Sequence, residues 1–143
     1  MKSATGHRVV AIDTAEEIGE IRHFVVSADV TRIERLHVDG RKKKAVFAEW
    51  SDLESFGDDR VMVVSSGAPT ESSDERDIEA ARGHIELIGS RILDTAGFER
   101  GTVRDATFES ETGEIVALVS SDEEEIPAGS VRSLGSYAVV VDG

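Results

Sequence analysis

The residues of this sequence that could take part in chemistry are its histidines, its clustered carboxylates and one basic run. The four histidines, His7, His23, His37 and His84, are scattered, and none has the spacing of paired ligands on one helix. His23 and His37 fall on neighbouring expected strands, where together with an Asp or Glu they would suit a metal. Partly exposed structural histidines are the other interpretation, and it is the one we adopt: no metal site is predicted.

The clustered carboxylates do not have the spacing of a catalytic or calcium-binding site. Residues 122–125 read Asp-Glu-Glu-Glu, without the alternating spacing of a calcium loop, so a solvated turn is expected there. Asp58 and Asp59 precede an expected strand, where Asp commonly supports turn geometry. No nucleophile elbow, phosphate loop, zinc-protease helix or dinucleotide turn is present, and the chain has no cysteine. The sequence therefore predicts a non-enzyme with no catalytic residues and no cofactor.

One short segment, Arg41, Lys42, Lys43 and Lys44, opposes the charge of the rest of the chain. The chain has 29 acidic and 16 basic residues and a net charge of −13, which disfavours general binding to nucleic acid. The basic run fits a solvated hairpin tip that protects a strand edge. It also fits a docking patch for an acidic partner, such as the 122–125 turn of another copy, and contact with a membrane or nucleic acid is a third interpretation.

Trp50 is the only tryptophan of the chain, and Phe47 lies three residues before it. Burial in a core is one interpretation of both residues, and a partly exposed interface anchor is the other, because Trp is enriched at binding hot spots. With His23 and the basic run Arg41–Lys44, they make up our candidate partner-binding residues, all in the first half of the chain.

The elements that must position these residues are repeated. Placing Gly19 on Gly101, an offset of 82, also aligns Ile33 with Ile115 without a gap. Near the end of each half, Gly57 aligns with Gly135 at an offset of 78, so the first copy holds four extra residues, in or near residues 39–46. Two anchored blocks in the same order predict two copies of one module. We expect domains at 1–67 and 87–143 and a linker at 68–86.

Each copy is predicted to be built of strands, because its apolar segments are rich in Val, Ile, Phe and Thr and are bounded by turn residues. The expected strands are 9–12, 18–28, 30–39, 44–48 and 60–65 in the first copy, and 91–94, 100–109, 114–120, 124–126 and 137–142 in the second. Continuous apolar runs at 61–64 and 139–141 are typical of strands covered on both faces, in a closed barrel or between barrels. In the linker, Ser73 is a plausible N-cap of a short helix that Gly83 would close.

The second copy resembles a PRC-barrel domain across residues 88–118 and 125–141. The similarity lies in a Gly-x-Val-x-Asp sequence that opens a long strand, an Ile-Pro step before a short turn, and a Gly followed by a Val-rich closing strand. These positions are held by Gly101, Val103, Asp105, Ile126, Pro127, Gly135 and Val139. The first copy matches more loosely: His23 replaces the Asp, and residues 47–50 replace the Ile-Pro step.

This resemblance implies an all-β fold of two tandem, small, SH3-like PRC barrels joined by a short, partly helical linker, acting as a docking surface. The tandem is similar to the archaeal PRC-barrel proteins of cell division, which link a SepF-type membrane anchor of the FtsZ ring to further PRC-barrel partners. The expected protein is thus a cytoplasmic adaptor at mid-cell, in a homo- or hetero-oligomer, touching the membrane only indirectly. The resemblance also leaves open a ribosome- or RNA-associated maturation factor, or an accessory subunit of a membrane electron-transfer complex. No membrane-spanning run or signal peptide is expected.

Overall fold

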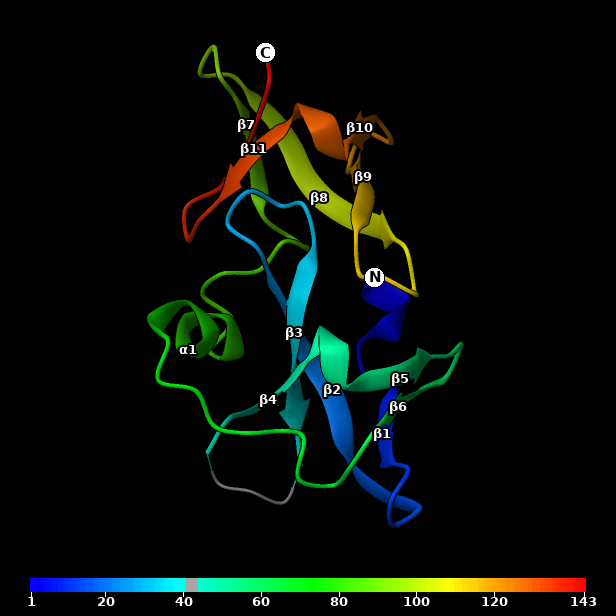
Figure 1. Ribbon diagram of the computed structural model, residues 1–143. Helices are drawn as coiled ribbons and strands as arrows, with labels where there is room; N and C mark the ends of the chain where they lie inside the picture. Colours follow the sequence, from blue (N-terminus) through cyan, green and yellow to red (C-terminus); the bar gives the residue numbers. More distant parts are fainter. Residues whose placement is uncertain (41–43) are drawn as a thin grey trace.

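The computed structural model describes residues 1–40 and 44–143 and shows a mostly β chain with two six-stranded sheets (Figure 1). The first sheet has the strand order β4-β3-β2-β1-β6-β5, in which β1 and β6 run parallel and the other neighbours antiparallel. Short 3₁₀ turns precede β1 and connect β4 to β5. The elements of this half are η1 (Lys2–Ala4), β1 (Arg8–Ala11), β2 (Glu16–Val26), β3 (Ile33–Asp39), β4 (Val46–Glu49), η2 (Trp50–Asp52), β5 (Leu53–Phe56) and β6 (Arg60–Val63).

The second sheet repeats this topology strand for strand. Its order is β10-β9-β8-β7-β12-β11, with β7 and β12 as the parallel pair. The elements are β7 (Arg91–Asp94), β8 (Glu99–Phe108), β9 (Ile115–Ser120), β10 (Glu125–Pro127), η3 (Ala128–Ser130), β11 (Val131–Leu134) and β12 (Val139–Val141). The expected fold, two tandem small β-barrels with a short, partly helical linker, is therefore confirmed.

The sequence did not predict the short strands β5 and β11. Their outward residues are polar and each strand forms an edge of its sheet, so neither shows a long apolar signal. The predicted strand 18–28 ends two residues later than β2, and the predicted strand 30–39 begins three residues earlier than β3, because residues 27–32 form a turn instead. In that turn the Asp29 carboxylate accepts from the backbone and hydroxyl of Thr31, and Val30 has a φ of +60°.

The linker helix α1 (Glu75–Ala81) begins one residue later than predicted. Asp74, not Ser73, is the N-cap, and its carboxylate accepts from the backbone of Arg76 and Asp77. Carboxylates are the stronger acceptors for helix N-terminal amides, which explains the choice. Gly83 lies just past the helix with a φ of +76°, as expected for a closing glycine.

Helix α1 is attached to both barrels by charged side chains. The buried Asp77 carboxylate accepts from Arg35 of β3 at 3.0 Å and from Ser72 at 2.6 Å. The Arg76 guanidinium donates to the carbonyl of Val26 at 3.3 Å and to that of Leu134 at 3.0 Å, one from each barrel. Helix α1 thereby ties the two barrels together as well as connecting them along the chain.

The two barrels meet through a reciprocal pair of hydrogen bonds. The Ile33 amide donates to the Gly113 carbonyl at 2.8 Å, and the Ile115 amide donates to the Thr31 carbonyl at 3.0 Å. These residues correspond at the repeat offset of 82, so the barrels are related locally by a pseudo-two-fold axis. In an exact two-fold dimer the same surface of each subunit would make both halves of such an interface.

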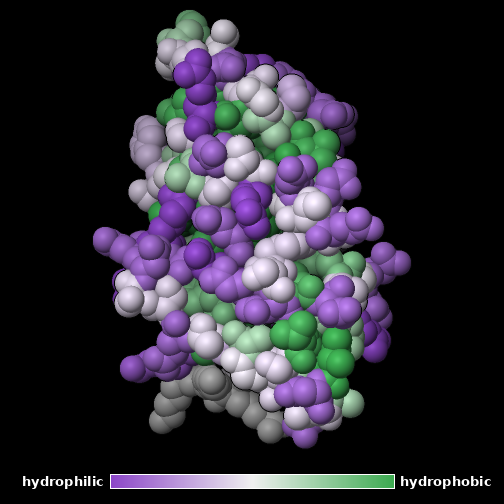
Figure 2. Space-filling model, viewed as in Figure 1, coloured by the Kyte–Doolittle hydropathy of each residue, from purple (hydrophilic) through white to green (hydrophobic). Residues whose placement is uncertain are grey.

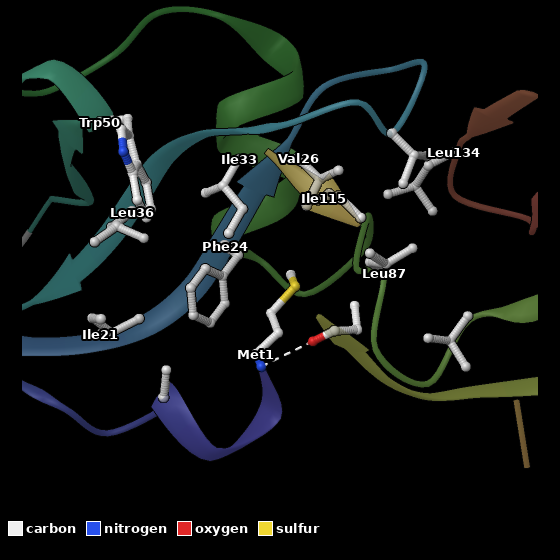
Figure 3. Close-up of a cluster of buried hydrophobic side chains, with 14 of the residues drawn as sticks. Met1, Ile21, Phe24, Val26, Ile33, Leu36, Trp50, Leu87, Ile115 and Leu134 are labelled. Atoms are coloured by element: carbon white, nitrogen blue, oxygen red, sulfur yellow. Dashed lines mark hydrogen bonds between the residues drawn. The ribbon is translucent and has the colours of Figure 1, made fainter. Parts of the chain in front are cut away.

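One hydrophobic core runs through both barrels (Figure 3). Ile33 and Leu36 come from the first barrel, and Ile115 and Leu134 from the second. Met1 also packs here, and its amino nitrogen donates to the carbonyl of Ala106 on β8 at 3.0 Å. Because the buried apolar surface is continuous, each barrel depends on the other for part of its burial.

Within the residues that the structure describes, no helix is long and apolar enough to cross a membrane.

Candidate interaction surfaces

The basic run predicted as a docking patch falls mostly outside the part of the chain that the structure describes. Arg41, Lys42 and Lys43 are not described. Lys44 is exposed and lies at the rim of a hollow of about 590 Å³ between β3, β4 and α1, floored in part by His37 and Phe47. The docking function of the run therefore stays a prediction.

Trp50 lies between the two barrels rather than on an outer surface, with 7% of it exposed. Its ring stacks on Phe56 at a centroid distance of 5.5 Å and meets the edge of Phe108, from the second barrel, at 6.0 Å. The indole N–H donates to the Glu111 carbonyl at 3.5 Å. A Cβ placed on Gly113 would come within 2.8 Å of the indole, so the second barrel approaches Trp50 with bare backbone. Trp50 thus anchors one barrel on the other.

Phe47 is also buried, beneath the linker. Its amide and carbonyl exchange hydrogen bonds of 2.8 and 3.0 Å with Thr70, so the linker pairs with the free edge of β4. Its side chain packs with Val25 and Ala80, the latter from α1. An edge strand that would otherwise be open to pairing is covered here by the chain itself.

His23 and His37 do approach each other across β2 and β3. They are directly paired in register, and their rings stack at 5.3 Å with an angle of 5° between planes. His23 Nδ1 contacts the Glu86 carboxylate, while Nδ1 of His37 is buried without a hydrogen-bond partner among the described residues. Burial, and then the neighbouring His23, lower the pKa of His37 below its ordinary value.

Two stacked rings and one carboxylate do not make a metal centre. Across residues 1–40 and 44–143, no group of three or more histidine or acidic side chains is arranged to hold a metal ion. The residues at 122–125 are exposed, and Glu123 and Glu124 pair with Arg104 and Arg100.

Asp105 occupies the repeat position that His23 holds in the first barrel, and each faces the segment that leads into the other barrel. Burial opposes ionisation of Asp105, but the amides of Lys2 and Ala106 and the Met1 amino group together lower its pKa below the ordinary value. His23 instead contacts Glu86, in the segment before β7. The two barrels thus carry different residues at this position because the position has different neighbours: hydrogen-bond donors for Asp105, and the Glu86 carboxylate for His23.

An apolar strip on the outside of the first barrel was not predicted. It consists of Val10 and Ile12 on or just after β1, and Met62 and Val64 on or just after β6, and we call it the outer strip. Burial alternates along both strands: Val9, Ala11, Val61 and Val63 face the core. Val10 pairs with Met62 in register, and the ladder continues because the Ile12 amide donates to the Val63 carbonyl at 2.9 Å.

The end of the outer strip is open to solvent, with Ile12 48% and Val64 45% exposed. In Figure 2 an apolar area at the lower right lies over the part of the barrel where Figure 1 shows β1, β5 and β6. The expectation that run 61–64 is covered on both faces is therefore wrong, since its outer side is exposed and does not lie between the barrels. The apolar run 61–64 was the sequence feature that could have predicted this strip. Packing against the core explains the apolar residues on the inner face of β6, but not those on its outer face.

The second barrel lacks this strip. Leu93 pairs with Val140 as Val10 pairs with Met62, but the next outward positions are Thr95 and Asp142. The two barrels therefore share an inner pattern and differ at the open end of the strip.

Comparison of the chain with known protein families and with curated proteins found no match.

Proposed function

We propose that the protein is a non-enzymatic adaptor built of two PRC barrels, with its partner site on the first barrel. The observation that carries this proposal is the outer strip, whose exposed end residues Ile12 and Val64 are replaced by Thr95 and Asp142 at the matching positions of the second barrel. Exposed apolar patches on an otherwise charged surface are typical of protein interfaces.

The PRC-barrel assignment is supported by the positions of the motif residues. Gly101 has a φ of +84°, and a Cβ there would come within 2.5 Å of the Ser121 hydroxyl, so glycine is required. Val103, Ile126 and Val139 are buried in the core of the second barrel. These four motif positions thus have a structural reason within a six-stranded barrel.

The attachment of the barrels to each other supports a scaffolding role. The reciprocal amide bonds of Ile33 and Ile115, the Trp50 contact and the Arg76 bridge fix the two barrels in one arrangement. A partner bound to one barrel is then held at a defined place relative to whatever binds the other. We propose cell division as the process, with a SepF-type protein and a further PRC-barrel protein as partners at mid-cell.

The test is affinity capture from the native host with mass spectrometry, together with imaging of a fluorescent fusion. Wild type is compared with a variant carrying Ile12→Thr and Val64→Thr, and with a matched Val116→Thr control, a β9 residue 47% exposed on the second barrel. We expect division proteins and a mid-cell band for wild type and control, and loss of both for the strip variant. Recovery of ribosomal proteins with diffuse fluorescence would refute the division role.

A further inference from the structure

The outer strip exposes apolar side chains, but neither of its strands has an unpaired backbone edge. Strand β1 is paired on one side with β2 and on the other with β6, and β6 is paired with β1 and β5. A partner therefore cannot add a strand here, and must lay side chains across the face of the sheet. An amphipathic helix, with apolar residues three and four positions apart, is the element that does this.

The rim of the strip is acidic. Glu17 pairs in register with Val10 and so lies on the same face of the sheet, and Asp13 follows Ile12 directly; both side chains are exposed. On the other side Ser55, next to Glu54, pairs with Met62. The two cations of this face, Arg8 and Arg60, precede the strip on β1 and β6, and each already has an acidic partner: Arg8 binds Glu17 at 2.7 Å and Arg60 binds Asp59 at 3.1 Å.

This charge pattern distinguishes between possible occupants. A second copy would bring the same acidic rim and a further net charge of −13 against the first, and like charges across an interface oppose association. A partner with Lys or Arg beside its apolar residues meets carboxylates of opposite sign.

We propose that the outer strip binds a basic amphipathic helix of a partner protein. Its aliphatic residues pack on Val10, Ile12, Met62 and Val64, and its flanking Lys or Arg residues face Asp13 and Glu17. This rests on the proposed adaptor function and specifies the partner's chemistry. Four side chains cover much less than the ~800 Å² per partner of a standard interface, so the complex exchanges rapidly.

The test uses the ¹⁵N-labelled full chain and a synthetic 14-residue peptide of Leu and Lys, with Leu spaced as one helix face. A second peptide of the same composition has its Leu residues scattered. We expect amide shifts that concentrate on β1 and β6, with the amphipathic peptide binding at least fivefold tighter than the scattered one. The Ile12→Thr and Val64→Thr variant should bind about tenfold more weakly, because the two substitutions remove apolar carbon atoms from the contact and place a hydroxyl group at each position. The Val116→Thr control should bind like wild type.

A second variant, Glu17→Gln, separates charge from packing. It should weaken peptide binding at low salt and flatten the salt dependence, because the apolar contact remains while the rim loses charge. Equal binding of both peptides, or shifts spread over the acidic turn at 122–125, would overturn the proposal. So would shifts of β1 and β6 that depend on protein concentration without peptide, since they would identify a second copy as the occupant.

The same variants separate this inference from the adaptor function. If the peptide does not bind but the strip variant still loses its captured partner, the helix assignment is wrong and the adaptor function stands. If the peptide binds at the strip but partner capture is unchanged in the strip variant, the strip is a basic-helix site and the proposed location of the adaptor's partner site is refuted.

Discussion

Replacement of Gly113 by alanine tests whether the two barrels are packed as tightly as the Trp50 contact indicates. Gly113 has a φ of +78°, and a Cβ there would lie 2.8 and 3.0 Å from two indole carbons and 3.2 Å from the Ile33 carbonyl oxygen. The left-handed backbone alone costs an alanine about 1–2 kcal/mol. Overpacking adds about 1–3 kcal/mol, because the ring and the carbonyl can both move only by disturbing the hydrogen bonds between the barrels.

Gly97 provides a matched control in the same barrel. Its φ is +92°, but a Cβ there would meet nothing within 4 Å, so Gly97→Ala should show the backbone cost alone. The expected free energy of unfolding therefore falls by about 1–2 kcal/mol for Gly97→Ala and by about 2–5 kcal/mol for Gly113→Ala. Urea unfolding measures both values, and the difference between them reports the contact with Trp50.

The single tryptophan makes the assay specific to this place. Trp50 fluorescence follows opening between the barrels, and circular dichroism follows loss of the strands. In Gly113→Ala we expect the fluorescence to change at lower urea than the circular dichroism, or with it. If the two alanine variants lose the same free energy within about 0.5 kcal/mol, the barrels do not pack closely at Gly113 and the inferred interface is wrong.

Three further predictions concern buried groups. Because the pKa of His37 is lowered in the folded state, its contribution to stability is present above the unfolded pKa of about 6.5 and is lost as pH falls below that value. Replacing His37 by Phe should therefore reduce the loss of stability between pH 7.5 and 5.5. An unchanged pH profile of the free energy of unfolding would contradict this. Arg35→Met should destabilise the protein by about 3–5 kcal/mol in urea unfolding, because the buried Asp77 carboxylate loses its charged partner, and a loss below 1 kcal/mol would show that Ser72 suffices. Leu118→Ala should cost about 2–5 kcal/mol by leaving a cavity in the second barrel, measured in the same way; a loss under 1 kcal/mol would mean that the core closes over the gap.

The repeat in the sequence was enough to predict the repeated topology, because glycines and apolar residues at two constant offsets can recur only if the same turns and strands recur. Short edge strands such as Leu53–Phe56 could not be predicted from the repeat. Their pairing is set by the long strands beside them, and their own residues are mostly polar.

The candidate site was harder to predict from the sequence than the fold. Trp50 was open to two interpretations because its neighbour Gly113 lies far along the chain, and only the folded arrangement brings them together. The outer strip was visible as the apolar run 61–64, but a run of this kind does not say which of its faces meets solvent. That distinction needs the register between β1 and β6.

The pseudo-two-fold contact has a consequence for how this chain could have come from a single ancestral module. Its hydrogen bonds are the same on both sides of the axis, but its residues are not: Trp50 of η2 rests on Gly113, while the repeat offsets place Ala128 of η3 and Thr31 at the corresponding positions. Two identical modules would carry the same residue on both sides. In a single chain the two copies can differ, so a large ring and a bare glycine can complement each other on one side only. Neither half, duplicated, can rebuild the present molecule.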